Sequence, residues 1–322
     1  TRKSVEIYDD NGALANREMR TINIDAARVD KGGYKHFMAK EIAEQPSVLK
    51  KSLSHYQNTD ASEVELPTHD IDLANIDRLT MVACGTAFYA ALTAKYWFEK
   101  IARLPVDVDV ASEFRYREPP VRPGTCALFV SQSGETADTL AALRYMASKN
   151  ATILSVVNVT ESSIARESDL VLPLHAGVEI GVASTKAFTA QLTVLALLAI
   201  KIAYAKGTID AAQYRAHIAE LNRLPGLISQ ALGIDSAIQY ISKKLAAAQD
   251  IIFLGRGALY PLAMEGALKL KEISYIHAEG YPSGELKHGP IALIDKNVPV
   301  VVMAPMDPLF DKSVSNMQEV MA

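Results

Sequence analysis

Cysteine is scarce in this sequence, with two residues, Cys84 and Cys126, among 322. Two cysteines cannot build a disulfide framework, and no spacing of cysteine and histidine is typical of a zinc site, so we expect no bound metal. Basic residues are not in excess, because 33 Lys and Arg stand against 37 Asp and Glu, which argues against nucleic acid as a partner. The longest proline-free apolar run, 194–200, is far shorter than the ~18 residues of a membrane span. These absences predict a cytoplasmic protein that binds neither nucleic acid nor a membrane.

The N-terminal part differs from the rest of the chain in composition. It begins in a charged, strand-like run without an initiating Met, so we expect the sequence to be a piece of a longer protein. Residues 4–8 alternate polar and apolar side chains, and Asp10-Asn11-Gly12 after them is typical of a hairpin turn. The following stretch is polar apart from a helical pattern around 37–53. We therefore interpret residues 1–71 as a connector and expect the compact fold to begin near residue 72.

Predicted strands and helices alternate from there on. Apolar runs of four to six residues end in turn residues, and a helical pattern follows most of them. The longest helical pattern, 184–206, is apolar on most of its surface and is expected to be buried. This alternation indicates an α/β fold, with a parallel sheet covered by helices on both faces. The predicted strands of this first domain, residues 72–206, are 79–83, 106–110, 127–130, 152–157 and 170–174.

A second copy of the same pattern follows in the sequence. At an offset of 171 residues, the apolar run 251–254 and the turn Gly255-Arg256-Gly257 align with the first strand and turn of the first domain. The same offset places Tyr260 on Tyr89. Self-similarity of this length indicates a repeated fold unit. We therefore predict a first domain, a helical connector over 207–249, and a second, incomplete domain over 250–322.

The polar stretch Ser131-Gln132-Ser133-Gly134-Glu135-Thr136 lies between a buried strand and a helix. Ligands of open α/β sheets bind at this place, and the free N–H groups of a helix start attract anions. Three hydroxyl groups, on Ser131, Ser133 and Thr136, suit a small phosphoester. The alternative is ordinary helix capping, for which Ser and Thr are also favoured. The stretch has neither the Lys of a nucleotide phosphate loop nor a G-x-G-x-x-G pattern, so we expect no nucleotide and no other cofactor.

Two further loops are predicted to open at the same edge of the sheet. Cys84-Gly85-Thr86 ends the neighbouring strand, where Thr86 can donate to the same ligand. Cys84 has no His or Asn near it in sequence, so a small residue in a tight turn is favoured over a nucleophile. Gly181-Val182-Ala183-Ser184-Thr185-Lys186 is a third loop with hydroxyls at a helix start. Three such loops together favour phosphate binding over capping alone.

Charged residues in the second repeat form a separate group. Glu265, Lys269 and Glu272 are spaced i, i+4 and i+7 on one predicted helix and so share a face. A solvated ion-pair ladder is the alternative, but the rest of this helix is small and apolar, which favours a face directed into a cleft. A carboxylate there can transfer protons beside a lysine that neutralises negative charge. His288 lies in a polar loop suited to chemistry, whereas His277 follows an apolar run and is expected in the core.

Five separated motifs together resemble the isomerase half of the glutamine–fructose-6-phosphate amidotransferase (glucosamine-6-phosphate synthase) family: 84–86, 131–136, 181–186, 265–277 and 284–290. They occur in the family's order, and the resemblance extends over the whole chain. It implies two copies of the sugar isomerase (SIS) fold in a homodimer. It also implies conversion of fructose 6-phosphate to glucosamine 6-phosphate for amino-sugar synthesis, with ammonia that a glutaminase domain releases from glutamine.

The resemblance also implies roles for individual residues. Glu272 is implied to be the base that moves a proton between C1 and C2 of the sugar, with Lys269 beside it. His288 is implied to reach the neighbouring subunit's site and assist ring opening. Glu265 is the rival carboxylate, and we rank it lower because the helix dipole explains a carboxylate near a helix start. The implied substrate-binding residues are Cys84, Gly85, Thr86, Ser131, Gln132, Ser133, Thr136, Val182, Ser184 and Glu272.

Departures from the family pattern leave alternatives open. Ala87 stands where relatives often carry Ser, and the sequence contains neither the glutaminase domain nor the family's C-terminal tail with its lysine. We therefore expect this chain to release no ammonia from glutamine. One alternative is a standalone phosphosugar isomerase or deaminase, although residues 1–50 resemble the junction after a glutaminase domain. The other is a non-catalytic sugar-phosphate sensor, but a sensor is expected to have lost Glu272 and His288, and both are present.

Overall fold

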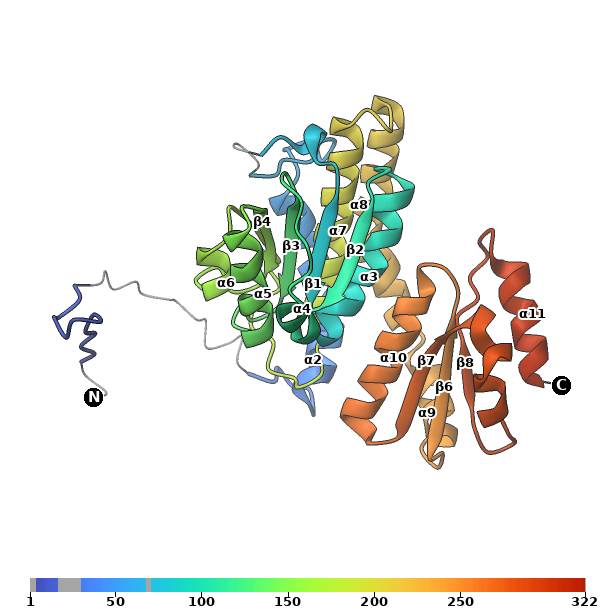
Figure 1. The fold of residues 1–322 in the computed structure, drawn as a ribbon. Coiled ribbons are helices and arrows are strands. Elements are labelled where there is room, and N and C mark those ends of the chain that lie inside the picture. Colours follow the sequence, from blue (N-terminus) through green and yellow to red (C-terminus); the bar gives the residue numbers. More distant parts are fainter. Residues whose placement is uncertain (1–3, 17–29, 68–70, 322) are drawn as a thin grey trace.

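The computed structural model describes residues 4–16, 30–67 and 71–321, and most of these residues form two α/β lobes (Figure 1). The first lobe is built on a five-stranded sheet and the second on a three-stranded sheet. Every pair of neighbouring strands in both sheets is parallel. The predicted α/β class, with parallel sheets flanked by helices, is therefore confirmed.

The first sheet has the strand order β2-β1-β3-β4-β5. Its bounds are β1 Leu79–Ala83, β2 Val106–Val110, β3 Cys126–Ser131, β4 Thr152–Val157 and β5 Leu170–Pro173. These bounds agree with the five predicted strands to within one residue at each end. The helices that follow these strands are α3 Gly85–Lys100, α4 Ala111–Arg117, α5 Ala137–Ser148, α6 Ser163–Arg166 and α7 Lys186–Ala205.

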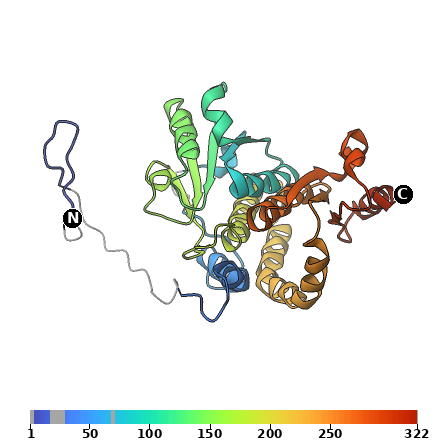
Figure 2. The same ribbon diagram turned by 90° about the horizontal axis from the view of Figure 1, so that it is seen from below.

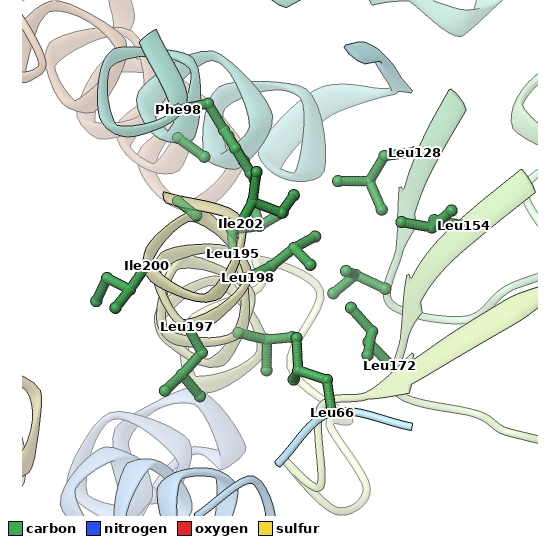
Figure 3. Close-up of a cluster of buried hydrophobic side chains, with 14 of the residues drawn as sticks. Leu66, Phe98, Leu128, Leu154, Leu172, Leu195, Leu197, Leu198, Ile200 and Ile202 are labelled. Carbon is green, nitrogen blue, oxygen red and sulfur yellow. The ribbon is translucent and has the colours of Figure 1, made fainter. Parts of the chain in front are cut away.

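The central strand β3 explains why both faces of this sheet are covered. All six of its residues are buried. Leu128 and Val130 belong to one hydrophobic cluster, whereas Ala127 and Phe129 belong to another, because successive side chains of a strand point to opposite faces. The larger cluster also includes side chains of α7. Figure 3 shows Leu198 of this helix on the side of Leu128, Leu154 and Leu172 of the sheet, whereas Ile200 points away from the sheet.

Helix α7 is long and apolar enough to cross a membrane, by length and composition only. It is the one helix of the described residues that meets this test. Most of it is buried inside the first lobe, and it packs against α2 (Phe37–His55), α3 and β4. Its apolar composition is therefore explained by its place in the core.

The N-terminal helix α2 belongs to the core of the first lobe. Leu49 and Leu53 of α2, with Tyr56 and Val64 after it, are buried in the same cluster as the first sheet. Figure 2 shows α2 as the blue helix beside the long helices of this lobe. The core of the first lobe thus extends to residues before 72, where we expected the compact fold to begin. The sequence pattern missed this because α2 carries only a narrow apolar face.

Two shorter features of the N-terminal and connecting segments agree with the sequence pattern. The turn at Asn11-Gly12 joins the paired residues Tyr8 and Leu14. The segment predicted as a helical connector contains α8 Ala211–Leu232 and α9 Asp235–Leu245. Helix α8 begins with a capping box at Asp210 and packs against α2 and α7.

The second lobe repeats the beginning of the first. Its sheet has the order β7-β6-β8, which corresponds to β2-β1-β3. Strand β7 begins at His277 and β2 at Val106, a separation of 171 residues that equals the offset of the sequence repeat. The elements of the second lobe are β6 Asp250–Gly255, α10 Leu259–Ser274, β7 His277–Pro282, η2 Ser283–His288, η3 Pro290–Leu293, β8 Val300–Val302 and α11 Phe310–Met321, where η denotes a short 3₁₀ helix. The first lobe contains one such short helix, η1 Leu73–Asn75.

His277 corrects one expectation from the sequence. We expected it in the core, but its side chain is 61% exposed at the start of β7, where it contacts Asp250 at 2.7 Å. The preceding helix ends at Ser274, and Tyr275 has a left-handed backbone conformation. The chain therefore turns out of the apolar run before it reaches His277.

Candidate functional site

The polar loops meet at the carboxyl ends of β1 and β3. These two strands are neighbours, but the chain leaves β1 toward β2 and leaves β3 toward β4, so the order of strands reverses between them. A ligand crevice is expected at such a reversal in an open parallel sheet. A pocket of about 210 Å³ lies here, lined by Cys84, Thr86, Ala87, Val130, Ser131, Gln132, Ser133, Thr136, Ser184 and Gln191.

The loop 131–136 is held in a compact turn by its own hydroxyls. Ser131 Oγ accepts a hydrogen bond from the N–H of Gly134 at 3.0 Å and lies 3.2 Å from Thr136 Oγ1. Gly134 has φ +66°, and a Cβ there would come within 1.9 Å of Ser162 Oγ. Only glycine therefore fits, and the turn brings the hydroxyl groups of Ser131 and Thr136 together on the pocket wall.

The side chain of Thr136 does not cap the helix that follows it. Thr136 is the residue before α5, yet its side chain makes no hydrogen bond to the first turn of that helix. The capping interpretation of the loop is therefore not supported at this residue. The N–H groups of the first turn of α5 remain a source of positive potential at the pocket.

Acidic side chains close to the loop are engaged with other groups. Glu135 accepts a hydrogen bond from the N–H of Ser163 at 2.6 Å, and this hydrogen bond lowers the pKa of Glu135. Asp138, in the first turn of α5, pairs with Arg115 at 2.9 Å. Both carboxylates are thus held by partners outside the pocket lining.

The loop 181–186 contributes less to the pocket than the sequence predicts. Ser184 lines the pocket but donates its hydroxyl to Glu179 Oε2 at 2.8 Å. The other oxygen of Glu179 accepts from the N–H groups of Thr185 and Ala187 at the start of α7. The helix start that we expected to offer anion-binding groups is therefore occupied by a carboxylate of the chain. Val182 is 94% exposed and does not line the pocket.

The second lobe reaches this edge through helix α10, which packs against α3. Thr86 Oγ1 donates a hydrogen bond to Glu265 Oε1 at 3.0 Å and accepts one from Lys269 Nζ at 3.0 Å. Lys269 Nζ is also 3.5 Å from Glu265 Oε1 and 2.5 Å from Glu272 Oε2. The predicted charged face thus meets the first lobe at Thr86, a residue that lines the pocket.

Glu265 is the most buried member of this group, with 5% of its surface exposed. Burial raises the pKa of Glu265 to about 7, against the opposing effects of Lys269 and the hydrogen bond from Thr86. Its second oxygen, Oε2, has no hydrogen-bond partner among the residues that the structure describes. The helix dipole, which is the explanation that the sequence favours, does not account for Glu265, because this residue is in the second turn of α10 and is hydrogen-bonded to Thr86.

Glu272 and Lys269 differ in exposure. The side chain of Glu272 is 31% exposed and that of Lys269 17%. Lys269 therefore lies between a buried carboxylate and a partly exposed one. An ammonium group in this place can shift its contact from one carboxylate to the other without being moved into water.

The remaining predicted residues divide into two groups. Cys84 lines the pocket, and its Sγ accepts a hydrogen bond from Thr139 at 3.9 Å. Ala87 lines the pocket and is buried, so a serine hydroxyl at this position would face the same space. His288 is exposed in η2, and within the described residues it makes no hydrogen bond or ion pair. The contacts of His288 within one chain therefore do not test its predicted role.

Gln191 is a pocket residue that we did not predict. It lies in α7 and is 1% exposed, and in the described part of the chain its Oε1 has no hydrogen-bond partner. A buried amide oxygen without a partner is costly unless a ligand or water donates to it. The signal in the sequence was the single amide side chain within the apolar helix pattern.

Comparison with protein families identifies the fold unit. The family described as "SIS domain" matches residues 72–201 and 244–318, which are most of the two lobes. The break between the matched segments contains α8 and most of α9. Both predicted repeats are thus covered by the same family.

Individual relatives are similar over the whole chain. The glutamine–fructose-6-phosphate aminotransferase (isomerizing) of Brucella abortus is 55% identical over 322 residues, and that of Zymomonas mobilis is 52% identical. The chain spans about half the length of these curated relatives, 53% of each.

Solved structures give the same assignment of the fold. The C-terminal domain of glucosamine–fructose-6-phosphate aminotransferase from Francisella tularensis is similar with a TM-score of 0.88 and 48% identity, over 90% of this chain and 82% of that one. A glucosamine-6-phosphate deaminase from Thermotoga maritima is similar with a TM-score of 0.71 and 25% identity, over 89% of this chain and 82% of that one.

Proposed function

The chain belongs to the SIS domain family, and from this we propose that it is the sugar-isomerising part of an enzyme that forms glucosamine 6-phosphate from fructose 6-phosphate and ammonia. The observation that carries the proposal is the position of Thr86. Its hydroxyl lines the pocket of hydroxyl groups in the first lobe and is hydrogen-bonded to Glu265 and Lys269 of the second. Groups that can bind a phosphate and groups that can transfer a proton are thus available to the two ends of one small substrate.

The phosphate is proposed to bind to the loop 131–136. Ser131, Ser133 and Thr136 line the pocket, and the first turn of α5 supplies positive potential at the same place. Binding by neutral donors suits a substrate that must leave after each turnover, because no fixed cation holds the phosphate. The orphaned Oε1 of Gln191 supports a ligand with hydroxyl groups, since a sugar hydroxyl can donate to it.

Glu272 is proposed to move the proton between C1 and C2 of the open-chain sugar or its imine. A carboxylate with 31% of its side chain exposed is accessible to a ligand and can accept a proton, and Lys269 Nζ lies 2.5 Å from its Oε2. As the proton leaves carbon, negative charge develops on the neighbouring oxygen or nitrogen. The ammonium group of Lys269 stabilises that charge, and protonated Glu272 then returns the proton to the adjacent carbon.

Ammonia is proposed to come from glutamine through a glutaminase domain, as the names of the relatives indicate for those proteins. We also propose a homodimer in which His288 serves the neighbouring site and assists ring opening. The exposure of His288 in η2 supports this, because a residue that acts on another subunit must be accessible at the surface of its own. A cytoplasmic location is a proposal of the same kind, and so is a connection to a glutaminase domain through the residues before α2.

Proton exchange with solvent tests the proposed function. The chain is incubated with fructose 6-phosphate in D₂O, and deuterium at C1 and newly formed glucose 6-phosphate are measured by NMR. We expect both with fructose 6-phosphate and neither with fructose, which has no phosphate. Binding without exchange would instead indicate a sensor, and ammonia release from glucosamine 6-phosphate would indicate a deaminase.

A further inference from the structure

We propose that Glu41 of α2 is a positioning residue that holds the loop 178–186 in the conformation that completes the sugar-phosphate pocket. The proposal rests on the proposed function, because the ligand used to test it is fructose 6-phosphate. Glu41 contacts no pocket residue directly. It acts through the backbone of a loop whose Ser184 lines the pocket.

The carboxylate of Glu41 is buried and is hydrogen-bonded to the backbone of the loop. Glu41 is 2% exposed, and its Oε1 accepts hydrogen bonds from the N–H groups of Ile180 at 2.6 Å and Gly181 at 3.1 Å. Its Oε2 accepts from the same Gly181 N–H at 3.2 Å. Within the described residues Glu41 forms no ion pair. A buried carboxylate without a cation is expensive unless N–H groups solvate it, so the two loop amides are what makes its burial tolerable.

Gly181 and Glu41 fit each other sterically. A Cβ on Gly181 would lie 2.4 Å from Glu41 Oε2, closer than van der Waals contact allows. Gly181 does not have a positive φ, so backbone conformation does not require glycine here. The requirement is space, and the space is taken by the Glu41 carboxylate.

A second carboxylate of the same helix holds the other end of the loop. Glu44 Oε2 lies 2.7 Å from Lys186 Nζ, and the side chain of Lys186 is 5% exposed. The loop is therefore tied to α2 at 180–181 and again at 186. Ser184 lies between these two anchors, where Glu179 accepts its hydroxyl hydrogen bond.

The pocket therefore depends on α2, a helix that precedes the first strand and connects no two strands of either sheet. The loop 178–186 contains no helix or strand before α7 begins, so its conformation is set by these side-chain anchors. Without Glu41 the loop samples other conformations, and the affinity for the ligand falls by the fraction of time the loop spends away from the bound form. Glu41 is thus a determinant of affinity that lies outside the pocket.

Three variants test this anchor. Glu41→Ala removes both acceptors, Glu41→Gln keeps the shape and one acceptor, and Lys50→Ala is a matched control at an exposed position of the same helix. Affinity for fructose 6-phosphate is measured by calorimetry. We expect Glu41→Ala to weaken binding about tenfold, equivalent to about 1.4 kcal/mol, Glu41→Gln to weaken it less, and Lys50→Ala to leave it unchanged.

Hydrogen–deuterium exchange of the peptide 178–186 reports the anchor itself. We expect faster exchange of this peptide in Glu41→Ala and Glu41→Gln without ligand, and unchanged exchange in the strands of the first sheet. If Glu41→Ala does not fold, the Glu41→Gln exchange decides the matter. Unchanged exchange and unchanged affinity in a folded Glu41 variant would overturn the proposal.

A double variant separates the anchor from a general loss of stability. Gly181→Ala should weaken binding in the parent, because its Cβ collides with the carboxylate. In the Glu41→Ala background the collision partner is gone, so the same substitution should have a smaller effect. Equal effects in both backgrounds would contradict the proposal. If the parent itself does not bind fructose 6-phosphate, the proposed function fails, while the exchange experiment still tests the anchor.

Discussion

The two repeats share a structural unit but carry different side chains on it. In the first, β1 is followed by Cys84-Gly85-Thr86, and hydroxyl groups line the pocket together with other uncharged side chains. In the second, the turn Gly255-Arg256-Gly257 begins at the last residue of β6, and charged side chains of α10 contact the pocket residue Thr86. The fold unit therefore fixes where a side chain is presented, and its chemistry is set independently in each copy.

The repeats differ also in packing. The first lobe contains two extensive clusters of buried hydrophobic residues, one on each face of its sheet. The buried cluster of the second lobe consists of Ile252, Leu254 and Leu286. The neutral pocket is therefore built on a densely packed sheet, and the charged helix on a more sparsely packed one.

The largest effect is expected for Glu272→Gln, which keeps the shape of the side chain and removes the base that the second repeat is proposed to supply. We expect exchange of the C1 proton of fructose 6-phosphate to fall about 10³-fold, the usual scale for loss of a general base, while binding is retained. Glu99→Gln, at an exposed position of α3, is the control and should exchange at the parental rate. If Glu272→Gln also exchanges at the parental rate, Glu272 is not the base, and Glu265 or His288 is to be tested next.

The contrast in packing predicts unequal effects of the same substitution. Leu128→Ala, in the first sheet, should lower the free energy of unfolding by about 3 kcal/mol, because it leaves a cavity in a dense core. Leu254→Ala, in the second sheet, should lower it less, since its small cluster can collapse into the space. Urea unfolding followed by far-ultraviolet circular dichroism measures both variants, because it reports the helices of both lobes. Equal losses of free energy in the two variants would contradict the contrast in packing.

The buried Glu265 predicts a pH dependence of stability at the junction between the repeats. Its pKa is raised from 4.5 to about 7, so the native protein binds a proton that the unfolded chain releases. The free energy of unfolding should therefore fall from about pH 4.5 to pH 7, by up to about 3 kcal/mol. Glu265→Gln cannot titrate, so it should lose less stability than the parent between pH 5 and pH 8. The free energies of unfolding of the two proteins are measured by urea unfolding across this pH range. If they change equally with pH, Glu265 is not the group that causes the pH dependence.

The smallest predicted effect concerns a single hydroxyl of the first repeat. Ser133→Ala should weaken binding of fructose 6-phosphate by about 1–2 kcal/mol, the scale of a lost hydrogen bond to a charged group. Calorimetry measures the change, with Ser148→Ala at the exposed end of α5 as the control. Unchanged affinity of Ser133→Ala would remove this residue from the proposed phosphate site.

Most of the first sheet could be predicted from the sequence, and part of the second could not. The first-lobe strands are apolar runs bounded by turn residues, so their pattern is sufficient. Strand β7 reads His-Ala-Glu-Gly-Tyr-Pro, with residues that disfavour strands. It forms because β6 supplies its hydrogen-bond partners at the register of the repeat, which is tertiary information.

The candidate site, too, could be predicted from the sequence only in part. The loop 131–136 was predictable, because a strand and a helix that are close in sequence hold its hydroxyls. The hydrogen bond from Thr86 to Glu265 spans 179 residues and depends on how α10 packs against α3. Glu41 and Gln191 were missed for a related reason. Each lies in a helix pattern that predicts structure but does not tell which loop or pocket the helix will face.

The proposed arrangement of substrate is tested most directly by a crystal structure of this chain with bound fructose 6-phosphate. We expect phosphate oxygens within about 3 Å of the hydroxyls of Ser131, Ser133 and Thr136, the usual length of such hydrogen bonds, and C1 and C2 directed toward Glu272. A phosphate held instead by Lys269, with the loop 131–136 free of ligand, would contradict the division of chemistry between the two repeats.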